Sequence, residues 1–335
     1  MMPPMTPTTP SEELWADASR SLQVLRSTLS RVIVGQDALV QDLVTAVFAG
    51  GHVLVEGLPG LGKTQLAKAL AAGLGLEGRR VQCTPDLMPA DITGAEVYET
   101  SRDGSSNFRF RPGPVFAQLL LVDEINRATP RTQAALLEAM QERQVTQAGT
   151  THALPDPFCV IATQNPIELE GTFPLPEAQL DRFMFKLCMP TPERATLQAL
   201  LDVSLDSEPA DGVTPVLDPA GVRALVALCR RILVGERCRA AAVDLILATQ
   251  PAPQASDMRR EIRYGASPRA LQALVRAARV RALMAGRPHV DVDDLAEVAA
   301  PVLRHRLLLR LESELDGLDS DAVLRSVVDT WRQRL

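Results

Sequence analysis

The stretch GLPGLGKT, residues 57 to 64, decides how the rest of the sequence is interpreted. It matches the pattern GxxxxGK[ST], with Gly57, Gly62, Lys63 and Thr64 at the fixed positions. In such a loop the glycines let backbone N–H groups point at phosphate oxygens, the lysine adds a positive charge at the outer phosphates, and the hydroxyl ligates Mg²⁺. The chain has only three lysines, so a chance match is on the order of one in a thousand.

The segments that flank this loop fit the same interpretation. Residues 52–56 (HVLVE) form a short apolar run that predicts a buried strand, and residues 65–75 (QLAKALAAGLG) have leucine and alanine at helical spacing. A phosphate-binding loop between a strand and a helix is therefore expected here, in preference to a simple Gly-rich turn. The predicted nucleotide contacts in this loop are Pro59, Gly60, Leu61, Gly62, Lys63, Thr64 and Gln65.

Short apolar stretches alternate with helical patterns along the first part of the chain. They are VLV at 53, RRVQC at 79, LLLVDE at 119, FCVIATQN at 158 and MFKLCM at 184. Such alternation is typical of a parallel sheet that helices cover on both faces. The sequence therefore predicts an α/β fold.

The pattern changes after residue 194, and this change suggests a second domain. Residues 1–11 are rich in Pro and Thr and are expected to be disordered. Residues 12–204 then form the nucleotide-binding core, and residues 205–218 resemble a linker. Residues 219–335 contain one helical pattern after another and predict a smaller, all-α lid domain.

Composition limits the classes of function. The net charge of −6 and a pI of about 5.4 give no overall basic field for nucleic acid or an anionic membrane. No apolar run approaches the roughly 20 residues that cross a bilayer, and the N-terminus has no signal-peptide core, so a cytoplasmic protein is expected. The five cysteines lack a CxxC pattern and the four histidines lack metal-ligand spacing, which favours structural thiols and disfavours a zinc site.

Two carboxylates follow the apolar strand at 119. Asp123 and Glu124 are expected at the carboxyl edge of the sheet, where ligands bind in open parallel sheets. Asp123 is predicted to hold Mg²⁺ through its water shell, and Glu124 to polarise the attacking water. An acidic pair by itself is usually a solvated strand end, but the phosphate loop upstream favours the catalytic interpretation.

Three further polar residues are candidates for the same site. Asn165 ends the next strand and is predicted to orient water against the γ-phosphate, with a turn-forming Asn as the alternative. Arg182 is predicted to complete a neighbouring subunit's site and neutralise transition-state charge, with a salt bridge to Glu177 or Asp181 as the alternative. Arg269 follows Pro268 at the start of a helix and is predicted to reach back over the nucleotide from the lid, unless it is an ordinary surface arginine.

The motifs together resemble the MoxR family of AAA+ ATPases. The match runs in order from about residue 31 to 310, and the stretch NPIELEGTFPLPEAQLDRF is specific to that family within the AAA+ class. The motifs that carry the resemblance are IVGQD, GLPGLGKT, CTPDLMPADITG, LLLVDEINRATPRTQAALLEAMQER, ATQNPIELEGTFPLPEAQLDRF and GASPRA.

This resemblance implies an AAA+ P-loop NTPase fold, an αβα sandwich with a parallel five-stranded sheet and a helical lid, assembled into hexameric rings with ATP and Mg²⁺ between subunits. By motif position it assigns Lys63 and Thr64 to Walker A and Asp123 and Glu124 to Walker B. In the same way, Asn165 is sensor 1, Arg182 the arginine finger and Arg269 sensor 2. Val34 and Gly35 fall where such proteins touch the adenine, and Arg127 is expected to face the interface, in a role that is less defined.

Two insertions fit the same family. Residues 94–114 have a polar turn between partly alternating flanks, and residues 143–157 turn at Gly149, so both are predicted to be hairpins. By resemblance they face the pore and touch the client protein. The alternative is that both are passive surface hairpins.

The leading functional hypothesis is an ATP-hydrolysing chaperone that remodels or matures partner proteins. The resemblance implies assistance in metal or cofactor insertion and cooperation with a partner carrying a von Willebrand factor A domain. Three alternatives stay open: a DNA-acting AAA+ motor, a magnesium-chelatase-type AAA+ subunit, and a nucleotide switch without turnover. A DNA motor would need basic hairpins, whereas here arginines are partly offset by acids. The identity of the client is not encoded in any readable motif.

Overall fold

We describe a computed structural model of the chain, in which residues 12–100, 106–168, 171–194, 196–198, 212–255 and 257–335 are described. The predicted disordered segment 1–11, the first half of the predicted linker (205–211) and most of the first hairpin's turn lie outside these residues. Within the described residues, no helix combines the length and the apolar character needed to cross a membrane.

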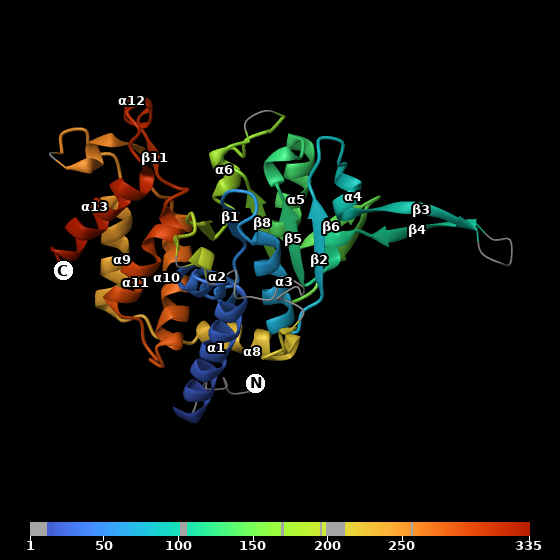
Figure 1. Cartoon of the computed structure of the whole chain (residues 1–335), viewed down its shortest axis with the longest axis horizontal. Helices are drawn as coiled ribbons and strands as arrows, with labels where there is room; N and C mark the ends of the chain where they lie inside the picture. Colours follow the sequence, from blue (N-terminus) through green and yellow to red (C-terminus); the bar gives the residue numbers. More distant parts are fainter. Residues whose placement is uncertain (1–11, 101–105, 169–170, 195, 199–211, 256) are drawn as a thin grey trace, which may run out of the picture.

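A parallel sheet of five strands lies at the centre of the molecule (Figure 1). All neighbouring pairs run parallel, in the order β2-β5-β8-β1-β9. The bounds are β1 Val53–Glu56, β2 Gly78–Gln82, β5 Leu119–Asp123, β8 Cys159–Gln164 and β9 Phe185–Cys188. The predicted parallel five-stranded sheet is confirmed.

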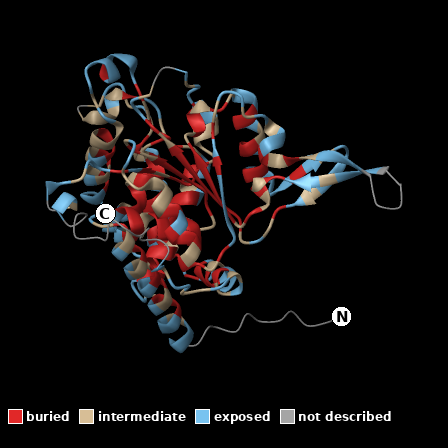
Figure 2. Ribbon diagram, turned by 45° about the vertical axis from the view of Figure 1, so that its right-hand side comes forward, coloured by how far each residue is buried: buried red, intermediate tan, exposed pale blue. Residues whose placement is uncertain are grey.

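Helices cover both faces of this sheet, which explains why its central strands are apolar throughout. Successive side chains of a strand point to opposite faces, so Val53 and Val55 of β1 belong to one apolar cluster and Leu54 to the other. The first face is covered by α2 (Asp37–Phe48) and α3 (Lys63–Gly73), with α1 (Glu12–Val32) packed on both. The second is covered by α4 (Pro89–Thr93) and α5 (Pro130–Glu142). Figure 2 shows the buried strands between these two layers.

Two antiparallel hairpins extend from the core. β3 (Gly94–Thr100) pairs with β4 (Ser106–Pro112), and this hairpin projects far from the sheet (Figure 1). β6 (Gln144–Gln147) pairs with β7 (Thr150–Ala153) around a turn in which Ala148 and Gly149 have φ values of 46° and 81°. Consecutive positive φ values are typical of the tight turns that match strand twist.

The C-terminal part of the described chain, from residue 219 onward, is nearly all helical, and we call it the C-terminal helices. It contains α8 Pro219–Cys229, α9 Glu236–Ala248, α10 Pro268–Met284, α11 Val292–Leu303, α12 Leu311–Leu315 and α13 Ser320–Arg332. The structure adds one feature that helical periodicity did not predict, a short antiparallel pair of β10 (Ile262–Tyr264) and β11 (Leu308–Leu309). A pair this short has too few residues to show a period of two.

The C-terminal helices share their apolar core with the first face of the sheet. Helix α10 packs against α1 and α2, and α11 packs against β9. Buried residues of all these elements belong to one continuous cluster, for example Leu22, Phe48 and Leu274. The C-terminal helices are therefore packed firmly onto the sheet layer that carries the phosphate loop.

Candidate functional site

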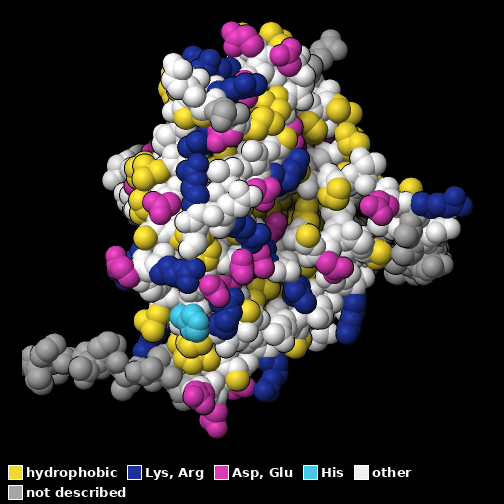
Figure 3. All heavy atoms as spheres, turned by 90° about the vertical axis from the view of Figure 1, so that its left-hand side faces the viewer, with side chains coloured by type: hydrophobic (Ala, Val, Ile, Leu, Met, Phe, Trp, Pro, Cys, Tyr) yellow, Lys and Arg dark blue, Asp and Glu magenta, His cyan; other side chains and the backbone are white. Residues whose placement is uncertain are grey.

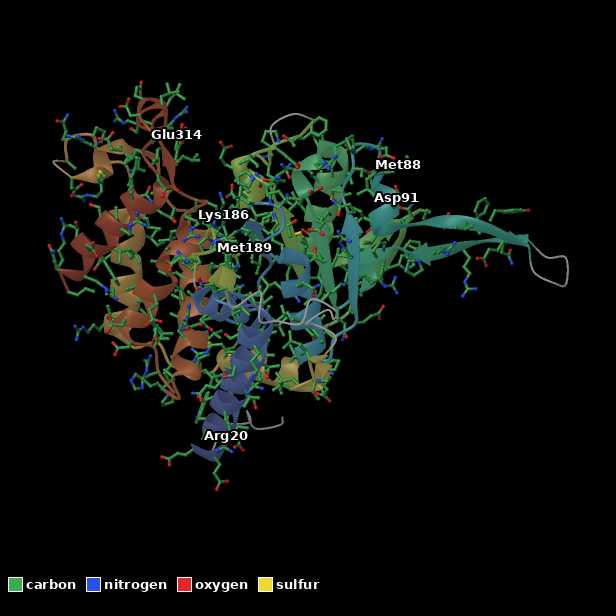
Figure 4. The ribbon with its side chains drawn as sticks, in the orientation of Figure 1. Arg20, Met88, Asp91, Lys186, Met189 and Glu314 are labelled. Atoms are coloured by element: carbon green, nitrogen blue, oxygen red, sulfur yellow. The ribbon has the colours of Figure 1, made fainter. Side chains whose placement is uncertain are left out.

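The phosphate loop connects the end of β1 to the start of α3. Gly60 and Gly62 have φ values of 80° and 84°, in the left-handed region that glycine adopts at little cost, and the space where their side chains would stand is open. Gly57 is constrained differently, because a β-carbon there would lie 2.8 Å from the β-carbon of Met189. Met189 follows β9, and Figure 4 shows it beside the central strands. The phosphate loop thus packs against Met189 at Gly57, whereas the space next to Gly60 and Gly62 is open.

Lys63 is the first residue of α3, and its ammonium group lies inside the loop. Its Nζ donates to the carbonyl oxygens of Gly57 at 2.6 Å and Gln164 at 3.4 Å. Burial lowers the pKa of Lys63 from its usual range, while the nearby carboxylates of Asp123 and Glu124 act in the opposite direction. The side chain is therefore positioned to exchange backbone carbonyls for phosphate oxygens.

Asp123 ends β5 and is 6% exposed. Its carboxylate accepts hydrogen bonds from Thr64 Oγ1 at 3.2 Å and from Thr163 Oγ1 at 2.8 Å. The Nη2 of Arg80, from β2, forms an ion pair with Asp123 Oδ2 at 2.8 Å. A threonine hydroxyl and a carboxylate meet at the edge of the phosphate loop, and oxygen atoms of this kind are what Mg²⁺ prefers.

Glu124 directly follows β5 and has a left-handed backbone, with φ 57°. Its backbone N–H donates to Thr163 Oγ1 at 2.9 Å, which fixes this turn. Its carboxylate is held by Gln82 Nε2 at 2.7 Å and by Arg127 Nη1 at 3.1 Å. Within the described residues, Arg127 thus contacts Glu124 of its own chain.

Asn165 follows β8, between the ends of β5 and β1 in the sheet order. It is 2% exposed, and its Oδ1 accepts the N–H of Ile167 at 3.3 Å. Its Nδ2 is buried with no hydrogen-bond partner in the described residues. Buried donors are almost always satisfied, so an unpaired amide beside the phosphate loop suits a polar ligand such as a phosphate oxygen or a water molecule.

The predicted adenine contacts lie in the turn between α1 and α2. Gly35 has φ 74°, and a β-carbon there would lie 2.4 Å from Thr196 Oγ1. Val34 next to it is half-buried. This turn therefore lies against the segment that follows β9, which also contains Met189, the residue under Gly57.

Arg182 lies at the opposite edge of the sheet. It precedes β9, whose first residue Phe185 pairs with Val53 at the start of β1. Its Nη1 donates to the Leu137 carbonyl of α5 at 2.8 Å, and in the described part of the chain it forms no ion pair with Glu177 or Asp181. The phosphate loop follows the other end of β1. The length of this strand, with a rise of roughly 3.3 Å per residue, therefore separates Arg182 from the phosphate loop of its own chain.

Arg269 lies near the start of α10, next to the segment that carries Arg182. Its Nη1 lies 3.3 Å from Asp181 Oδ2, and it lines a cleft with Arg182 and His52. That Arg269 reaches over a nucleotide stays a prediction. The phosphate loop begins at Gly57, five residues of mostly extended chain from His52, which is roughly 16 Å. The structure therefore brings Arg269 together with Arg182 and not with Lys63. The packing of α10 on α1 and α2 causes this placement.

The segment that carries Arg182 is held by the C-terminal helices. Arg306 has a side chain that is 3% exposed, and it donates to the carbonyl oxygens of Asp181, Phe183 and Met184 at 3.1, 2.8 and 3.1 Å. It also pairs with the Asp181 carboxylate at 2.6 Å. The backbone on both sides of Arg182 is thus fixed by one buried guanidinium group.

Three residues of this arrangement were missed by sequence analysis, namely Arg80, Gln82 and Thr163. Each contacts Asp123 or Glu124 from a neighbouring strand. The register of β2 against β5, which pairs Gln82 with Asp123, brings the first two to the acids. Their only signal in the sequence is that they are polar residues in predicted strands. Such residues can contact an acidic strand end once the order and register of the strands are known.

The cysteines and histidines show no sign of a metal site in the described part of the chain. No group of three or more His, Cys, Asp or Glu side chains there could hold a metal ion. All five cysteines are free, and four are buried. His52 is buried, with Nε2 3.1 Å from the Met140 carbonyl oxygen and Nδ1 accepting the Val160 N–H at 3.0 Å.

Comparisons with known proteins agree with this geometry. Residues 52–185 match the model of the ATPase family associated with various cellular activities (AAA), and residues 254–327 match the AAA lid domain. The chain is 40% identical over 313 residues to the chaperone MoxR1 of Mycobacterium tuberculosis, covering 90% of this chain and 79% of MoxR1. The chain belongs to the MoxR family of AAA ATPases. As a member of this family it is an ATPase and binds nucleotide, and such proteins are in general oligomeric chaperones.

Other relatives extend the MoxR match over nearly the whole chain. The MoxR protein of Methylorubrum extorquens is 33% identical over 312 residues, covering 88% of this chain and 89% of that protein. The uncharacterized protein YeaC of Bacillus subtilis is 39% identical over 300 residues, covering 90% and 91%. A crystal structure of a Cytophaga hutchinsonii protein assigned as an ATPase superposes with a TM-score of 0.85 at 35% identity, over 95% of this chain and 96% of that one. The shared fold therefore includes the C-terminal helices as well as the sheet.

Proposed function

We propose that this MoxR-family ATPase hydrolyses ATP at the carboxyl edge of its sheet, with arginines supplied by a neighbouring copy, and uses the cycle to remodel a partner protein. The observation that carries this proposal is the division of the polar residues between two edges. Lys63, Thr64, Asp123, Glu124 and Asn165 meet at one edge, while Arg182 and Arg269 lie together at the other.

Nucleotide binding starts from the open loop. The backbone N–H groups from Gly60 to Gln65 and the ammonium of Lys63 would receive the phosphate chain, with Pro59 shaping the loop and Lys63 giving up its bond to the Gly57 carbonyl. Val34 and Gly35 would contact the adenine, beside Thr196.

Mg²⁺ would be held by Thr64 and by Asp123, directly or through water. Their oxygen atoms are 3.2 Å apart, and the described residues offer no denser cluster of ligands, which fits an ion that takes few protein ligands and completes its shell with phosphate and water. When bound, the ion neutralises charge on the phosphate oxygens. The guanidinium of Arg80 forms an ion pair with the Asp123 carboxylate in this structure. Arg80 must therefore move away before the carboxylate accepts a hydrated cation.

Hydrolysis depends on Glu124 and Asn165. Glu124 is bound to Gln82 and Arg127, and it would exchange one of these contacts for the attacking water and accept its proton. The unpaired Nδ2 of Asn165 would donate to that water or to a γ-phosphate oxygen. Phosphoryl transfer needs mainly such positioning and charge stabilisation.

Arg182 and Arg269 would act on the nucleotide of the next subunit. They line one cleft at the amino edge of the sheet, too far from their own phosphate loop to reach it. A guanidinium group from a neighbour stabilises the charge of the transition state and is worth roughly 10³ in rate or more. A closed ring, with six subunits as in the proposed family architecture, would give every site such a neighbour.

The projecting hairpin suits contact with a client protein. Near its tip, Tyr98 and Phe108 are 61% and 69% exposed, with ring centroids 5.3 Å apart. Among its described residues, Glu96 and Glu99 balance Arg109 and Arg111, so the hairpin offers apolar rings without the excess of positive charge that nucleic acid requires. A partner with a von Willebrand factor A domain, and assistance in metal or cofactor insertion, are the specific forms of client work that we propose.

Turnover measurements test the catalytic assignment. Lys63→Ala should lose ATP binding and turnover, whereas Glu124→Gln should bind ATP and turn it over at least about 10²-fold more slowly, because it lacks the base. The exposed Arg325→Gln is the matched control and should keep wild-type activity. Wild-type turnover in either active-site variant would contradict the assignment.

Protein concentration tests the shared site. The specific activity of the wild type should rise with concentration, because a dissociated chain lacks Arg182 and Arg269 of a neighbour. A flat specific activity over a wide dilution series would count against shared sites.

A pull-down tests the contact with clients. The Glu124→Gln protein with ATP should retain bound client proteins, and adding Tyr98→Ala/Phe108→Ala to this variant should reduce the amount of client that is recovered.

A further inference from the structure

A second cleft, which the proposed hydrolysis does not use, lies between the C-terminal helices and the base of the β6–β7 hairpin. Its volume is about 780 Å³, within the range of sites that hold small molecules. The end of α2 with Phe48 forms part of its wall, and Leu154 and Cys229 add apolar surface. We call it the arginine cleft because of the side chains described next.

Four arginines and one carboxylate line the arginine cleft. Arg143 comes from the hairpin base, Arg230 from the end of α8, and Arg276 and Arg279 from α10, while Asp156 is the single acid. None of these five side chains forms an ion pair within the described residues. This differs from the outer face of the C-terminal helices, where basic and acidic side chains are interspersed (Figure 3).

Arg279 is the most confined of these groups. Its Nε is buried without a hydrogen-bond partner in the described residues. Burial lowers the pKa of Arg279, and the positive charges of Arg239 and Arg276 act in the same direction. Arginine stays protonated in proteins, so these cations repel one another, and Asp156 is the single acid of the cleft against four arginines. A bound anion would relieve the repulsion and offer the unpaired donor a partner.

Arg143 is held in the cleft by the backbone. Its Nη2 donates to the Gly50 carbonyl at 3.3 Å, and its own φ of 53° lies in the left-handed region, where a residue with a β-carbon is disfavoured. Asparagine or glycine would suit this backbone better. Local conformation therefore does not explain the arginine, whereas a charged ligand in the cleft does.

The arginine cleft adjoins the cleft that contains Arg182 and Arg269. Gly50, Arg143 and Arg276 line both clefts, whereas Arg230, Arg279 and Asp156 line only the arginine cleft. On α10, ten residues separate Arg269 from Arg279, which is roughly 15 Å along the helix axis. A nucleotide of the next subunit that is contacted by Arg269 would therefore leave Arg279 without a partner.

We propose that the arginine cleft binds a phosphate chain, either inorganic or carried by a second nucleotide. Guanidinium forks match phosphate oxygens in a bidentate manner, and four of them around one cleft suit an anion with several phosphate groups. Arg143 belongs to the sheet side and the other three to the C-terminal helices, so the bound anion bridges the two parts and restrains their relative movement.

Calorimetry with inorganic tripolyphosphate tests this site. The full-length chain is first saturated with ADP, so that the phosphate loop is filled. Tripolyphosphate should then bind once per chain, and Arg276→Gln/Arg279→Gln should weaken its binding at least about tenfold, because the two substitutions remove charge-assisted hydrogen bonds to the phosphate oxygens. Arg325→Gln, outside the cleft, should bind like the wild type. Arg230→Gln, at an exposed position, tests the site again if the double variant fails to fold.

Several outcomes would overturn the proposal. They are no saturable tripolyphosphate binding by a wild type that takes up only one ADP per chain, equal binding by wild type and cleft variants, or loss of ring assembly in the cleft variants without any tripolyphosphate binding, which would make the cleft an interface between copies. The stoichiometry of ADP distinguishes the two sources of phosphate. A nucleotide source requires two ADP per wild-type chain and one per Arg276→Gln/Arg279→Gln chain, whereas an inorganic source requires one in both.

Discussion

The two edges of the sheet differ in how their functional residues are brought together. At the carboxyl edge, Lys63 and Thr64 directly follow the phosphate loop at the start of α3, Asp123 and Glu124 lie at the end of β5, and Asn165 follows the neighbouring strand β8. At the amino edge, Arg182 precedes β9 and Arg269 lies near the start of α10. Asp181, the residue before Arg182, pairs with both Arg269 and Arg306. The first group follows from a parallel sheet alone, while the second requires the C-terminal helices to be docked.

This difference shows how the enzyme separates its parts. In the proposed mechanism, the carboxyl edge supplies the phosphate and Mg²⁺ ligands from one chain, and the amino edge faces another subunit. Arg306 ties the geometry of the amino edge to the C-terminal helices. A movement of these helices would therefore move Arg182 relative to the sheet of the same chain.

Mixing two inactive variants tests whether the two edges belong to different subunits of one site. The expected change in ATP turnover is the largest of the effects described here. Arg182→Ala should lower turnover about 10³-fold, as expected for an arginine finger. Mixed with Lys63→Ala, it should regain activity, because an Arg182→Ala subunit has an intact phosphate loop and its Lys63→Ala neighbour supplies an intact arginine. ATP turnover of the mixture is compared with that of each variant alone.

The matched control mixes Lys63→Ala with Glu124→Gln. Both changes damage the same edge, so no interface in that mixture is complete and no recovery is expected. If the Arg182→Ala mixture recovers no better than this control, the arginine does not act across subunits.

Acid should destabilise the amino edge through His52, with an expected effect of intermediate size. Burial lowers the pKa of His52 from 6.5 to about 4, so between these values the unfolded chain binds a proton that the folded chain does not. The free energy of unfolding contributed by this group is therefore full above pH 6.5 and falls toward pH 4, by about 3 kcal/mol in total. His305, whose pKa burial also lowers well below 6.5, acts with the same sign.

Urea denaturation at a series of pH values between 7 and 4 measures this effect. His52→Gln should be less stable than the wild type at pH 7 but lose less stability on acidification, whereas the exposed His289→Gln should follow the wild type. If His52→Gln had the same pH dependence of stability as the wild type, burial of neutral His52 would not be the cause of the loss of stability in acid.

The smallest expected effect concerns Gln82 at the carboxyl edge. Gln82 donates to Glu124 at 2.7 Å and competes with the water that Glu124 must accept. Gln82→Ala should raise basal ATP turnover about two- to fivefold, in line with the net worth of one hydrogen bond. Steady-state ATPase assays measure the change, with the exposed Gln141→Ala as control. A decrease of the same size would mean that Gln82 positions Glu124 for catalysis.

The sequence by itself determined the carboxyl edge and the parallel five-stranded sheet. Gly57, Gly62, Lys63 and Thr64 lie within eight residues. Asp123 and Glu124 follow one apolar run, and Asn165 ends the next. These signals are local, because strand, loop and strand end are adjacent in the chain, and parallel strands always bring their carboxyl ends to one edge. The same logic could not place Arg269, since nothing within its helix states which edge of the sheet α10 will approach.

Only the tertiary structure decided the arrangement of the amino edge, the hydrogen-bond partners of Glu124 and the arginine cleft. Arg306 meets residues 181–184 across more than a hundred positions, Gln82 reaches Glu124 through strand register, and Arg143 meets Arg279 between two packed layers. Such meetings depend on how apolar faces pack, and many packings satisfy the same periodic pattern. The physical reason for the division is the range of the interaction: backbone geometry and strand ends act over a few residues, whereas the docking of helices on a sheet is settled by the whole core.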